Sequence, residues 1–274
     1  MPNMPKIYEY RGVRGFWMAE VLTDDPTNGY STGEVFVVAG VSNVTRNVEQ
    51  SMDTHCYNNY GAVVVDSVPT DQTTIDASAL PKDIYAKITG SYYDPYTGML
   101  VEGKRQVKYW AFGYIGEDTD GGEYYSWHLK ARVMVGGVAY TTKNNSTDAA
   151  GQTITFMGVR TSTEFVKNGA GANSVEIDAG LGLVDVTSFF NTVQTPDTIV
   201  PKTTYELTIT VGAGASNPVV KRNGVALADG DTIYAGDQLQ ISVVNGTVKV
   251  NNVAFTSGDI HVVTGNTTIA VTSA

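Results

Sequence analysis

The clearest alternation of apolar and polar residues lies in the last quarter of the chain. In the run YELTITV, positions 205, 207, 209 and 211 are apolar and the residues between them are polar, which is the period of a half-buried strand. The dipeptides Asn223-Gly224 and Asn245-Gly246 interrupt similar runs, and Asn-Gly suits a two-residue hairpin turn because both positions adopt positive φ. Short strands with such turns predict a small β-sandwich over residues 203–274.

A segment without a period precedes this region. The residues NTVQTPDTIVPKT, which begin at position 191, contain Pro196 and Pro201 among threonines and aspartate. Prolines and polar residues without a period are typical of connections between domains. We therefore expect an N-terminal domain over residues 1–195, a linker over 196–202 and a C-terminal domain over 203–274.

Strand patterns also dominate the larger N-terminal region. Runs rich in valine and aromatic residues predict strands in GFWMAEVL, EVFVVAG, VSNVTRNVEQ, GAVVVDSV, QVKYWAFGYIGE, EYYSWHLKARVMV and AGQTITFMGVR. Residues Thr119–Gly122 join two of these strands as a tight turn. The segment Ser51–Tyr60, SMDTHCYNNY, is polar and aromatic without a period, and it predicts a long mobile loop.

Two segments of this region favour a helix. Residues Thr74–Ile88 predict one helix, interrupted at Pro81 because proline lacks the amide that a helix interior needs. The run VDVTSFFNTV predicts a short closing helix capped by Asp185 or Thr187. The expected fold class is therefore mainly β, with a flanking helix.

Composition and charge argue against several classes of function. Charged residues make up 17% of the chain, against about 25% in an average soluble domain. The net charge of −10 repels phosphate and anionic lipid, which argues against a sequence-specific DNA-binding protein and a peripheral membrane protein. The single cysteine, Cys56, excludes an intrachain disulfide. Because no apolar signal segment opens the sequence, we expect synthesis in a reducing cytosol without export.

The residue pattern predicts no enzyme. His55 and Cys56 are the one pair that resembles a base and a nucleophile, but neighbouring side chains in an extended chain point in opposite directions. His128 and His261 lack the spacing of zinc ligands. We therefore expect no catalytic residue, no metal and no cofactor.

An acidic cluster and two glycine-rich runs are also weak candidates for a site. The cluster around Asp118 and Asp120 resembles the start of a calcium loop, but Glu123 stands where such a loop needs glycine. A hairpin turn with solvated carboxylates accounts for it better. The runs at 169–173 and 212–216 lack the spacing of a nucleotide-binding loop.

Aromatic residues gather in two neighbouring predicted strands. They are Tyr109, Trp110, Phe112, Tyr114, Tyr124, Tyr125 and Trp127. A stripe of this kind serves either as a carbohydrate platform or as packing within a core or a subunit interface. Packing is the commoner use, because aromatic side chains prefer pleated, half-buried surfaces.

One long segment resembles the major tail tube protein of long-tailed bacteriophages. It is LPKDIYAKITGSYYDPYTGMLVEGKRQVKYWAFGYIGEDTDGGEYYSWHLKARV, with a short helix, the connector YDPYTGMLVEG and an aromatic hairpin. Upstream, VSNVTRNVEQSMDTHCYNNY and GAVVVDSV are similar to the strand, long loop and strand of that family, and downstream GQTITFMGVRTSTEF is similar to its final barrel strand. The resemblance covers residues 5–195 and is most specific over 80–165.

The resemblance implies a tail-tube-type β-barrel or β-sandwich with a flanking helix. Residues 203–274 are similar to the immunoglobulin-like module that many such proteins carry. Six copies of the family's subunit form a ring by joining their sheets, and rings stack into a virion tail tube through which DNA passes without specific binding. The implied partners are further copies of the chain, the tape measure, the tail terminator and the baseplate or distal tail proteins, without a membrane. Assembly is expected in the host cytoplasm.

The predicted loop supplies the candidate contacts between rings, because a long loop can reach a neighbouring subunit and become ordered there. The candidate contact residues are Arg46, Glu49, Met52, His55, Tyr57 and Tyr60. Methionine and tyrosine suit an interface. Arg46 and Glu49, in the preceding strand, are expected to form exposed charge pairs worth about 0–1 kcal/mol each.

Two other classes of function stay open at this point. The region rich in threonine, asparagine and glycine after residue 203 suits a secreted or surface-attached β-sandwich adhesin, which a signal peptide in the native gene would favour. The aromatic stripe suits a carbohydrate-binding protein, which glycan binding by the isolated chain would favour.

Overall fold

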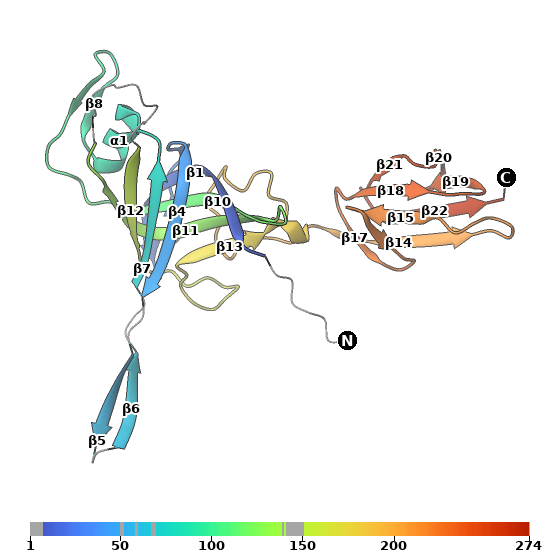
Figure 1. The fold of residues 1–274 in the computed structure, drawn as a ribbon, viewed down its shortest axis with the longest axis horizontal. Helices are drawn as coiled ribbons and strands as arrows, with labels where there is room; N and C mark the ends of the chain where they lie inside the picture. Colours follow the sequence, from blue (N-terminus) through green and yellow to red (C-terminus); the bar gives the residue numbers. More distant parts are fainter. Residues whose placement is uncertain are drawn as a thin grey trace. The chain divides into compact units, whose positions relative to one another are not determined.

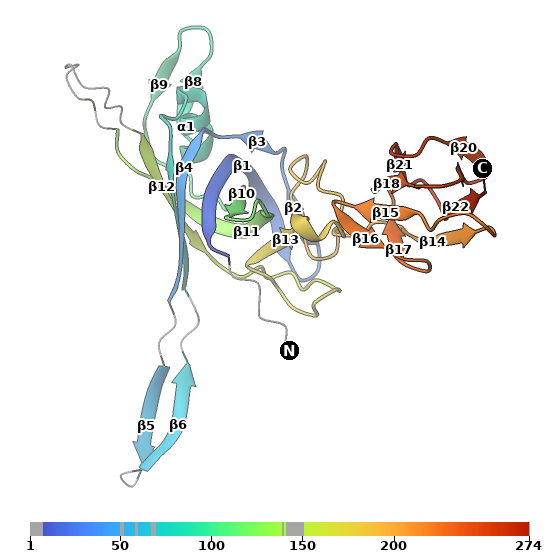
Figure 2. The same cartoon turned by 45° about the vertical axis from the view of Figure 1, so that its right-hand side comes forward.

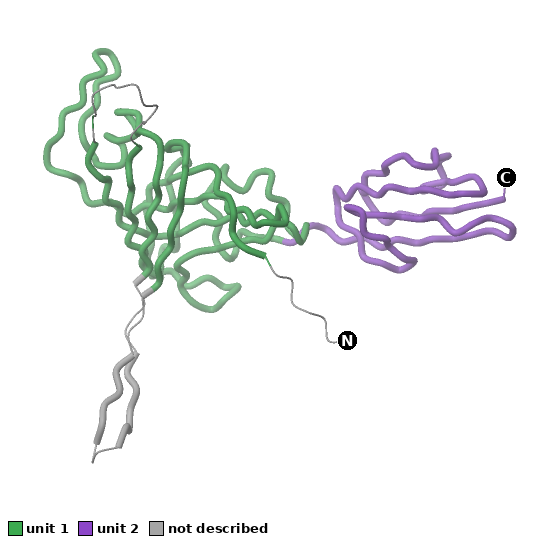
Figure 3. The backbone as a smooth tube through the Cα atoms, in the orientation of Figure 1, with its two compact units in different colours: residues 1–200 green, residues 201–274 purple. Residues whose placement is uncertain are grey.

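The protein is mainly β, as expected. The computed structural model describes residues 8–49, 52–57, 60–66, 70–138, 140 and 151–273, and it describes no side chain from residue 49 to residue 70. The chain divides into two compact units, residues 1–200 and residues 201–274 (Figure 3). The division falls inside the segment 196–202, which the sequence predicts to be a linker.

A nine-stranded antiparallel sheet organises unit 1 (Figures 1 and 2). Its continuous order is β2-β1-β10-β11-β12-β7-β4, with β13 paired to β11 and β3 paired to β1. The strands are β1 (Tyr10–Asp25), β2 (Gly29–Thr32), β3 (Phe36–Val37), β4 (Val41–Glu49), β7 (Thr70–Ala77), β10 (Trp110–Asp118), β11 (Glu123–Val135), β12 (Gln152–Gly158) and β13 (Ser174–Asp178). Strand β11 serves as a branch point, because residues 124–128 pair with β13 and residues 131–135 pair with β12.

The central strands of this sheet are buried on both faces, and each face has its own core. Strand β1 sends Phe16 and Met18 into a first core, which also contains Phe112, Ile75 and Phe156 from β10, β7 and β12. Successive side chains of a strand point to opposite faces. The neighbouring residues of β1 and β10 therefore enter a second core, whose members include Ala19, Ala111, Trp127, Leu129 and Phe189.

Helix α1 (Lys82–Thr89) covers one end of the first core, with Ile88 buried there and Ile84 packed against it. It follows Pro81 and ends at Gly90, whose φ of 73° is the left-handed conformation typical of a helix C-terminus. The predicted helix over Thr74–Ile88 is wrong in its first half, because residues 74–77 belong to β7. Ile75 and Ala77 are buried there, between polar neighbours. The alternation that marks this strand is short, and the residues that follow it favour a helix. The sequence alone therefore predicts a helix here.

The predicted closing helix in residues 184–193 is also wrong, since these residues form consecutive turns. The Asp185 carboxylate accepts a hydrogen bond from the amide of Thr187 at 3.0 Å. Such a bond offers the backbone an alternative to a helix. The two phenylalanines of the segment anchor it on the sheet: Phe189 is buried in the second core, and Phe190 stacks on Trp17 with 3.8 Å between ring centroids.

Two small hairpins complete unit 1. Strands β8 (Tyr92–Asp94) and β9 (Met99–Val101) pair beside α1 (Figure 2). Strands β5 (Met52–Tyr57) and β6 (Tyr60–Asp66) form a separate two-stranded sheet between β4 and β7 in the sequence. The 3-10 helix η1 (Ala179–Leu181) follows β13.

Unit 2 consists of a five-stranded and a four-stranded sheet around one core. The sheet orders are β17-β14-β22-β19-β20 and β16-β15-β18-β21. The strands are β14 (Thr204–Val211), β15 (Val219–Arg222), β16 (Val225–Leu227), β17 (Thr232–Tyr234), β18 (Gln238–Ser242), β19 (Thr247–Val250), β20 (Val253–Phe255), β21 (Ile260–Val262) and β22 (Thr267–Thr272). Both sheets contribute to the core, which includes Leu207, Ile241 and Ile269. The first and last strands, β14 and β22, pair in parallel.

The turns of unit 2 agree with the sequence at one of two predicted positions. Asn223 and Gly224 have φ of 51° and 81° and join β15 to β16, which is the predicted hairpin turn. Asn245-Gly246 is not a hairpin turn, because it connects β18 of one sheet to β19 of the other. The second turn with two positive φ values is Asn251-Asn252, between β19 and β20.

We predict that unit 1 folds without unit 2. Every member of the two unit 1 cores precedes residue 200, and every member of the unit 2 core follows residue 204. All three tryptophans lie in unit 1, so tryptophan fluorescence reports its unfolding alone. A chain of residues 1–200 should unfold cooperatively at the same denaturant midpoint as the full chain. Aggregation or a broad, non-cooperative transition would place essential contacts beyond residue 200.

Asp24 of β1 is hydrogen-bonded to the segment after β12. A second prediction follows from this contact. Its buried carboxylate accepts hydrogen bonds from Lys130 and from the amides of Ser162 and Thr163, the last two at 2.9 Å. Burial raises the pKa of Asp24, but these hydrogen bonds outweigh it and lower the pKa to about 2. Since an unfolded aspartate titrates near 3.9, the carboxylate stabilises the fold above about pH 4, and this stabilisation is lost as the pH falls towards 2.

Asp24→Asn should therefore lower the free energy of unfolding of unit 1 by about 2 kcal/mol at pH 7. The difference from the unchanged chain should shrink steadily between pH 4 and pH 2.5, measured by guanidinium unfolding with tryptophan fluorescence. Asp25→Asn is the control, because the Asp25 carboxylate accepts hydrogen bonds only from Thr27 and Asn28 of its own turn. If the two variants lose the same free energy of unfolding, the hydrogen bonds of the Asp24 carboxylate make no specific contribution to stability.

Candidate functional site

An ion-pair cluster lies where β4 and β7 meet the first core. Arg46 of β4 donates two hydrogen bonds to Asp71 of β7, with Nε–Oδ1 at 2.9 Å and Nη2–Oδ2 at 2.7 Å. The Asp71 side chain is only 2% exposed. His128 of β11 is buried beside it, with Nδ1 3.9 Å from the Asp71 carboxylate, and its ring stacks on Phe112. The cluster thus connects the terminal strand β4 with β7 and β11 of the same sheet.

The electrostatics of this cluster keep His128 neutral. Burial lowers the pKa of His128 to about 4, and the charge of Arg46 lowers it further, whereas Asp71 raises it. The hydrogen bonds to Asp71 raise the pKa of Arg46. At neutral pH the cluster therefore consists of an ion pair between the partly exposed Arg46 and the buried Asp71, together with an uncharged imidazole.

This geometry corrects the expectation for Arg46. The sequence predicts exposed charge pairs formed by Arg46 and Glu49, but Arg46 binds the buried Asp71, 25 residues away in the sequence. The two strands are neighbours, and Arg46 stands opposite Thr73 in the register. The arginine therefore reaches diagonally along β7 to Asp71. The side chain of Glu49 lies outside the described residues.

The other predicted contact residues lie on a hairpin instead of a loop. Met52, His55 and Tyr57 belong to β5 and Tyr60 begins β6, with Tyr57 opposite Tyr60 in the register. The prediction of an irregular loop over Ser51–Tyr60 is wrong for these strand residues. Strands show a period only where one face is buried and the other is solvated, and the sequence of β5 has no such alternation. Their side chains, and the pair His55-Cys56, lie outside the described side chains.

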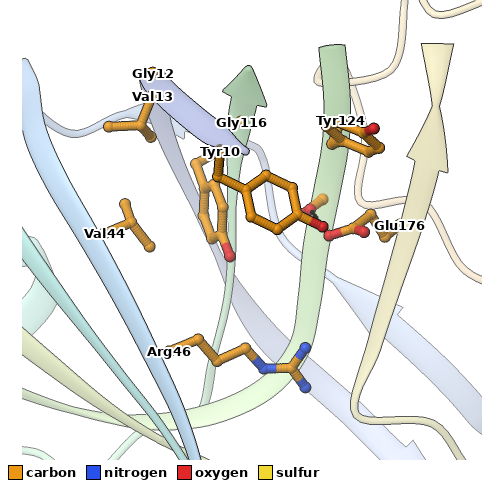
Figure 4. A pocket seen from close by; sticks show the side chains of 10 residues that line it. Tyr10, Gly12, Val13, Val44, Arg46, Gly116, Tyr124 and Glu176 are labelled. Carbon is orange, nitrogen blue, oxygen red and sulfur yellow. Dashed lines mark hydrogen bonds between the residues drawn. The ribbon is translucent and has the colours of Figure 1, made fainter. Parts of the chain in front are cut away.

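A cleft opens next to the ion-pair cluster, between β4 and the first half of β1 (Figure 4). It has a volume of about 420 Å³ and is lined by Tyr10, Gly12, Val13, Val44, Arg46, Tyr114, Gly116, Tyr124, Ser126 and Glu176. Figure 4 shows Arg46 at one side of the cleft and Tyr10 with Glu176 at the other. The Glu176 carboxylate accepts a hydrogen bond from Ser126 at 2.9 Å. Burial raises the pKa of Tyr114 to about 12, so this phenol is neutral.

Three tyrosines form an aromatic cluster at the rim of this cleft. Tyr8 stacks on Tyr124, with 6.3 Å between ring centroids, and Tyr10 packs edge-on against Tyr124 at 5.6 Å. Tyr10 is 73% exposed and Tyr8 is 41% exposed. The rim therefore presents large aromatic surfaces to the surroundings, next to the carboxylate of Glu176.

The predicted aromatic stripe is mostly core packing. Trp110, Phe112 and Trp127 are at most 1% exposed. Phe112 also stacks on Phe156, at 3.9 Å between centroids. Packing is therefore the correct interpretation for these three rings, and Tyr124 is the stripe member that reaches the rim of the cleft.

The acidic turn after β10 uses its carboxylate for the fold. Asp118 is buried and accepts hydrogen bonds from the amides of Asp120 and Gly122 at 2.9 and 2.7 Å. Across the described residues, no group of three or more histidine, cysteine, aspartate or glutamate side chains is placed to hold a metal ion. In the same part of the chain, no helix has the length and apolar character needed to cross a membrane.

The sequence alone points to neither Asp71 nor Glu176, and it presents His128 only as a histidine without the spacing of zinc ligands. These residues lie on β7, β11 and β13, and only the sheet topology brings them near β4 and β1. Neither the models of known protein families nor the curated proteins give a match to this sequence.

Proposed function

We propose that this protein is the structural subunit of a bacteriophage tail tube, in which six copies join into a ring and rings stack into a conduit for DNA. The observation that carries the proposal furthest is the open edge of β4. Within the described residues this nine-residue strand ends the main sheet, and no strand is hydrogen-bonded to its outer edge, which faces β1 across the cleft. Such an edge is a template for pairing with another chain.

The sequence of this edge lacks two of the usual protections against pairing. Monomeric proteins blunt edge strands with proline, lysine or inward-pointing charges. The β4 sequence VSNVTRNVE contains neither proline nor lysine, and its one inward-pointing charge, Arg46, is paired with Asp71. Val48 is 53% exposed on this strand. An edge of this kind favours a subunit that completes its sheet with a neighbouring copy.

Two further observations support the same function. The hairpin β5–β6 forms its own sheet and is inserted between two strands that are neighbours in the main sheet, which suits a segment that contacts another subunit. The net charge of −10 repels the phosphates of DNA, as a conduit for DNA requires. The predicted partners and the virion location belong to this proposal, as does the immunoglobulin-like assignment of unit 2.

Lysines placed on the open edge test this proposal. Thr45→Lys with Val48→Lys puts one charge on each face of β4, and like charges on paired copies should prevent assembly without unfolding the chain. Sedimentation velocity should show monomers of this variant at concentrations where the unchanged chain forms large assemblies. Met134→Lys with Met157→Lys is the matched control, because both methionines are exposed on strands with partners on both sides. Equal assembly of the edge variant and the control would rule out pairing through β4.

Carbohydrate binding by a surface adhesin is the second candidate. The observation in its favour is the exposed pair Tyr8 and Tyr10 beside Tyr124, at the rim of a cleft with Glu176. Glycan-array binding by the full chain that is abolished by Tyr10→Ala would favour this function. A chain that assembles and binds no glycan leaves the structural role as the better account.

A further inference from the structure

The two ends of strand β10 carry surfaces of opposite charge. The strand runs from Trp110 to Asp118, and at about 3.3 Å per residue its ends are about 26 Å apart. Near Trp110 lie the end of α1 and residues 105–108, and the hairpin β8–β9 lies beside α1 (Figure 2). Near Asp118 lie the start of β1, the start of β11 and the end of β13. We call these the basic end and the acidic end.

The basic end is the exception in an acidic protein. Residues 82–108 contain five basic and three acidic residues. Lys82, Lys87, Lys104 and Arg105 are exposed, and the ion pairs of the described residues include none of them. Exposed apolar and aromatic residues lie among these charges: Tyr92 (62%), Tyr96 (96%), Met99 (50%), Val101 (46%) and Val107 (68%).

The acidic end has the complementary chemistry. The segments 8–14, 117–126 and 174–178 contain seven acidic and two basic residues. Glu9, Glu117 and Glu176 are exposed there. One of the two basic residues, Arg14, is paired with Glu123. The tyrosine cluster and the cleft belong to this end, and tyrosine faces attract lysine and arginine side chains. Arg46, on the far side of the cleft, is neutralised by Asp71.

We propose that the acidic end binds the basic end of a second copy of this chain. The proposal rests on the self-assembly stated under the proposed function, and it adds the surfaces and the direction of one contact. Lys104 and Arg105 of one copy face Glu9, Glu117 and Glu176 of the next. Tyr8 and Tyr10 pack against the apolar residues of the basic end. Tyrosine, methionine and arginine are enriched in protein interfaces, and opposite charges around them fix orientation.

This contact joins two different surfaces, so it has a direction. A contact between unlike surfaces repeats from copy to copy, and it gives a closed ring or an open stack according to the rotation between copies. Because the charged residues are exposed, salt screens their attraction, with a Debye length of about 10 Å at 0.1 M and about 3 Å at 1 M. Assembly should therefore weaken as salt is added.

Charge reversal of each end, followed by reversal of both, tests the proposal in the full chain. Lys104→Glu with Arg105→Glu should raise the concentration for half-assembly at least about tenfold, and Glu9→Lys with Glu117→Lys should do the same. The chain with all four substitutions carries complementary ends again, so it should assemble with itself close to the original concentration. Sedimentation velocity at 50 mM and 500 mM salt measures assembly, and far-UV circular dichroism confirms that each chain is folded.

A matched control and the contrary outcomes complete the test. Lys221→Glu with Lys249→Glu makes the same change of charge on exposed residues of unit 2 and should assemble like the unchanged chain. If the single-end variants assemble normally, or if the folded four-substitution chain stays monomeric, the end-to-end contact is overturned while the proposed function stands. If the unchanged chain never assembles, the proposed function and the contact both fail.

Discussion

Replacing Arg46 with alanine is expected to lower the free energy of unfolding of unit 1 by about 3 kcal/mol at pH 8, because the substitution leaves the Asp71 charge buried without its partner. The loss should be smaller at pH 5.5. Arg46 lowers the pKa of His128 and Asp71 raises it, so removing the arginine raises this pKa and allows the imidazolium to pair with Asp71. Guanidinium unfolding followed by tryptophan fluorescence measures both values, and NMR titration of the histidine ring measures the pKa.

Two further variants separate the ion pair from a general loss of packing. Arg46→Lys keeps the positive charge, so the pKa of His128 should stay low although the bidentate geometry is lost. Lys108→Ala removes the partner of Glu20 from a pair in which both side chains are about 30% exposed, and it should cost only about 0–1 kcal/mol. If Arg46→Ala leaves the His128 pKa near its original value, the cluster is not coupled as the geometry indicates.

Removing the hairpin β5–β6 is expected to abolish stacking of rings while the subunit still folds. Glu49 and Thr70 are register partners at the base of the hairpin, so a two-residue Gly-Ser turn can join β4 directly to β7. The deleted strands belong to a separate sheet, so the strand pairing of the main sheet does not depend on them. Electron microscopy should show no tubes, and circular dichroism should show an intact β fold.

Smaller changes show which property of the hairpin matters. Met52→Ala, Tyr57→Ala and Tyr60→Ala together should impair tube formation strongly, because apolar and aromatic side chains supply most of the stability of an interface. Glu49→Gln is the charge control and should have little effect. Normal tubes from the hairpin-deleted chain would contradict the assignment of this segment to the contact between rings.

The fold class followed from the sequence because strand patterns and aromatic runs cover most of the chain. The predicted elements are wrong where the alternation of apolar and polar residues is short, or where the residues on the two faces of a strand are alike in polarity. Ile75 and Ala77 mark the end of β7 but stand next to a segment of helix formers, so the sequence predicts a helix there. The segment of β5 has no alternation, so the sequence predicts a loop there. At Asn245-Gly246 the dipeptide is typical of a hairpin, but the chain passes there from one sheet to the other.

The candidate site was far less predictable than the fold. The sequence predicts Arg46 as a contact residue, but its pairing with Asp71 depends on the diagonal register between β4 and β7. His128 reaches the same cluster from β11, which lies two strands from β7 in the sheet. The cleft combines residues from five strands. The spacing of residues along the sequence does not predict which of them lie together in the cleft, because the order of strands in the sheet decides this.

Electron microscopy of the purified 274-residue chain over rising concentrations tests the central claim most directly. The account predicts rings with sixfold symmetry and tubes of uniform diameter built from stacked rings. Only compact monomers at every concentration, also in the presence of the other tail proteins, would contradict it.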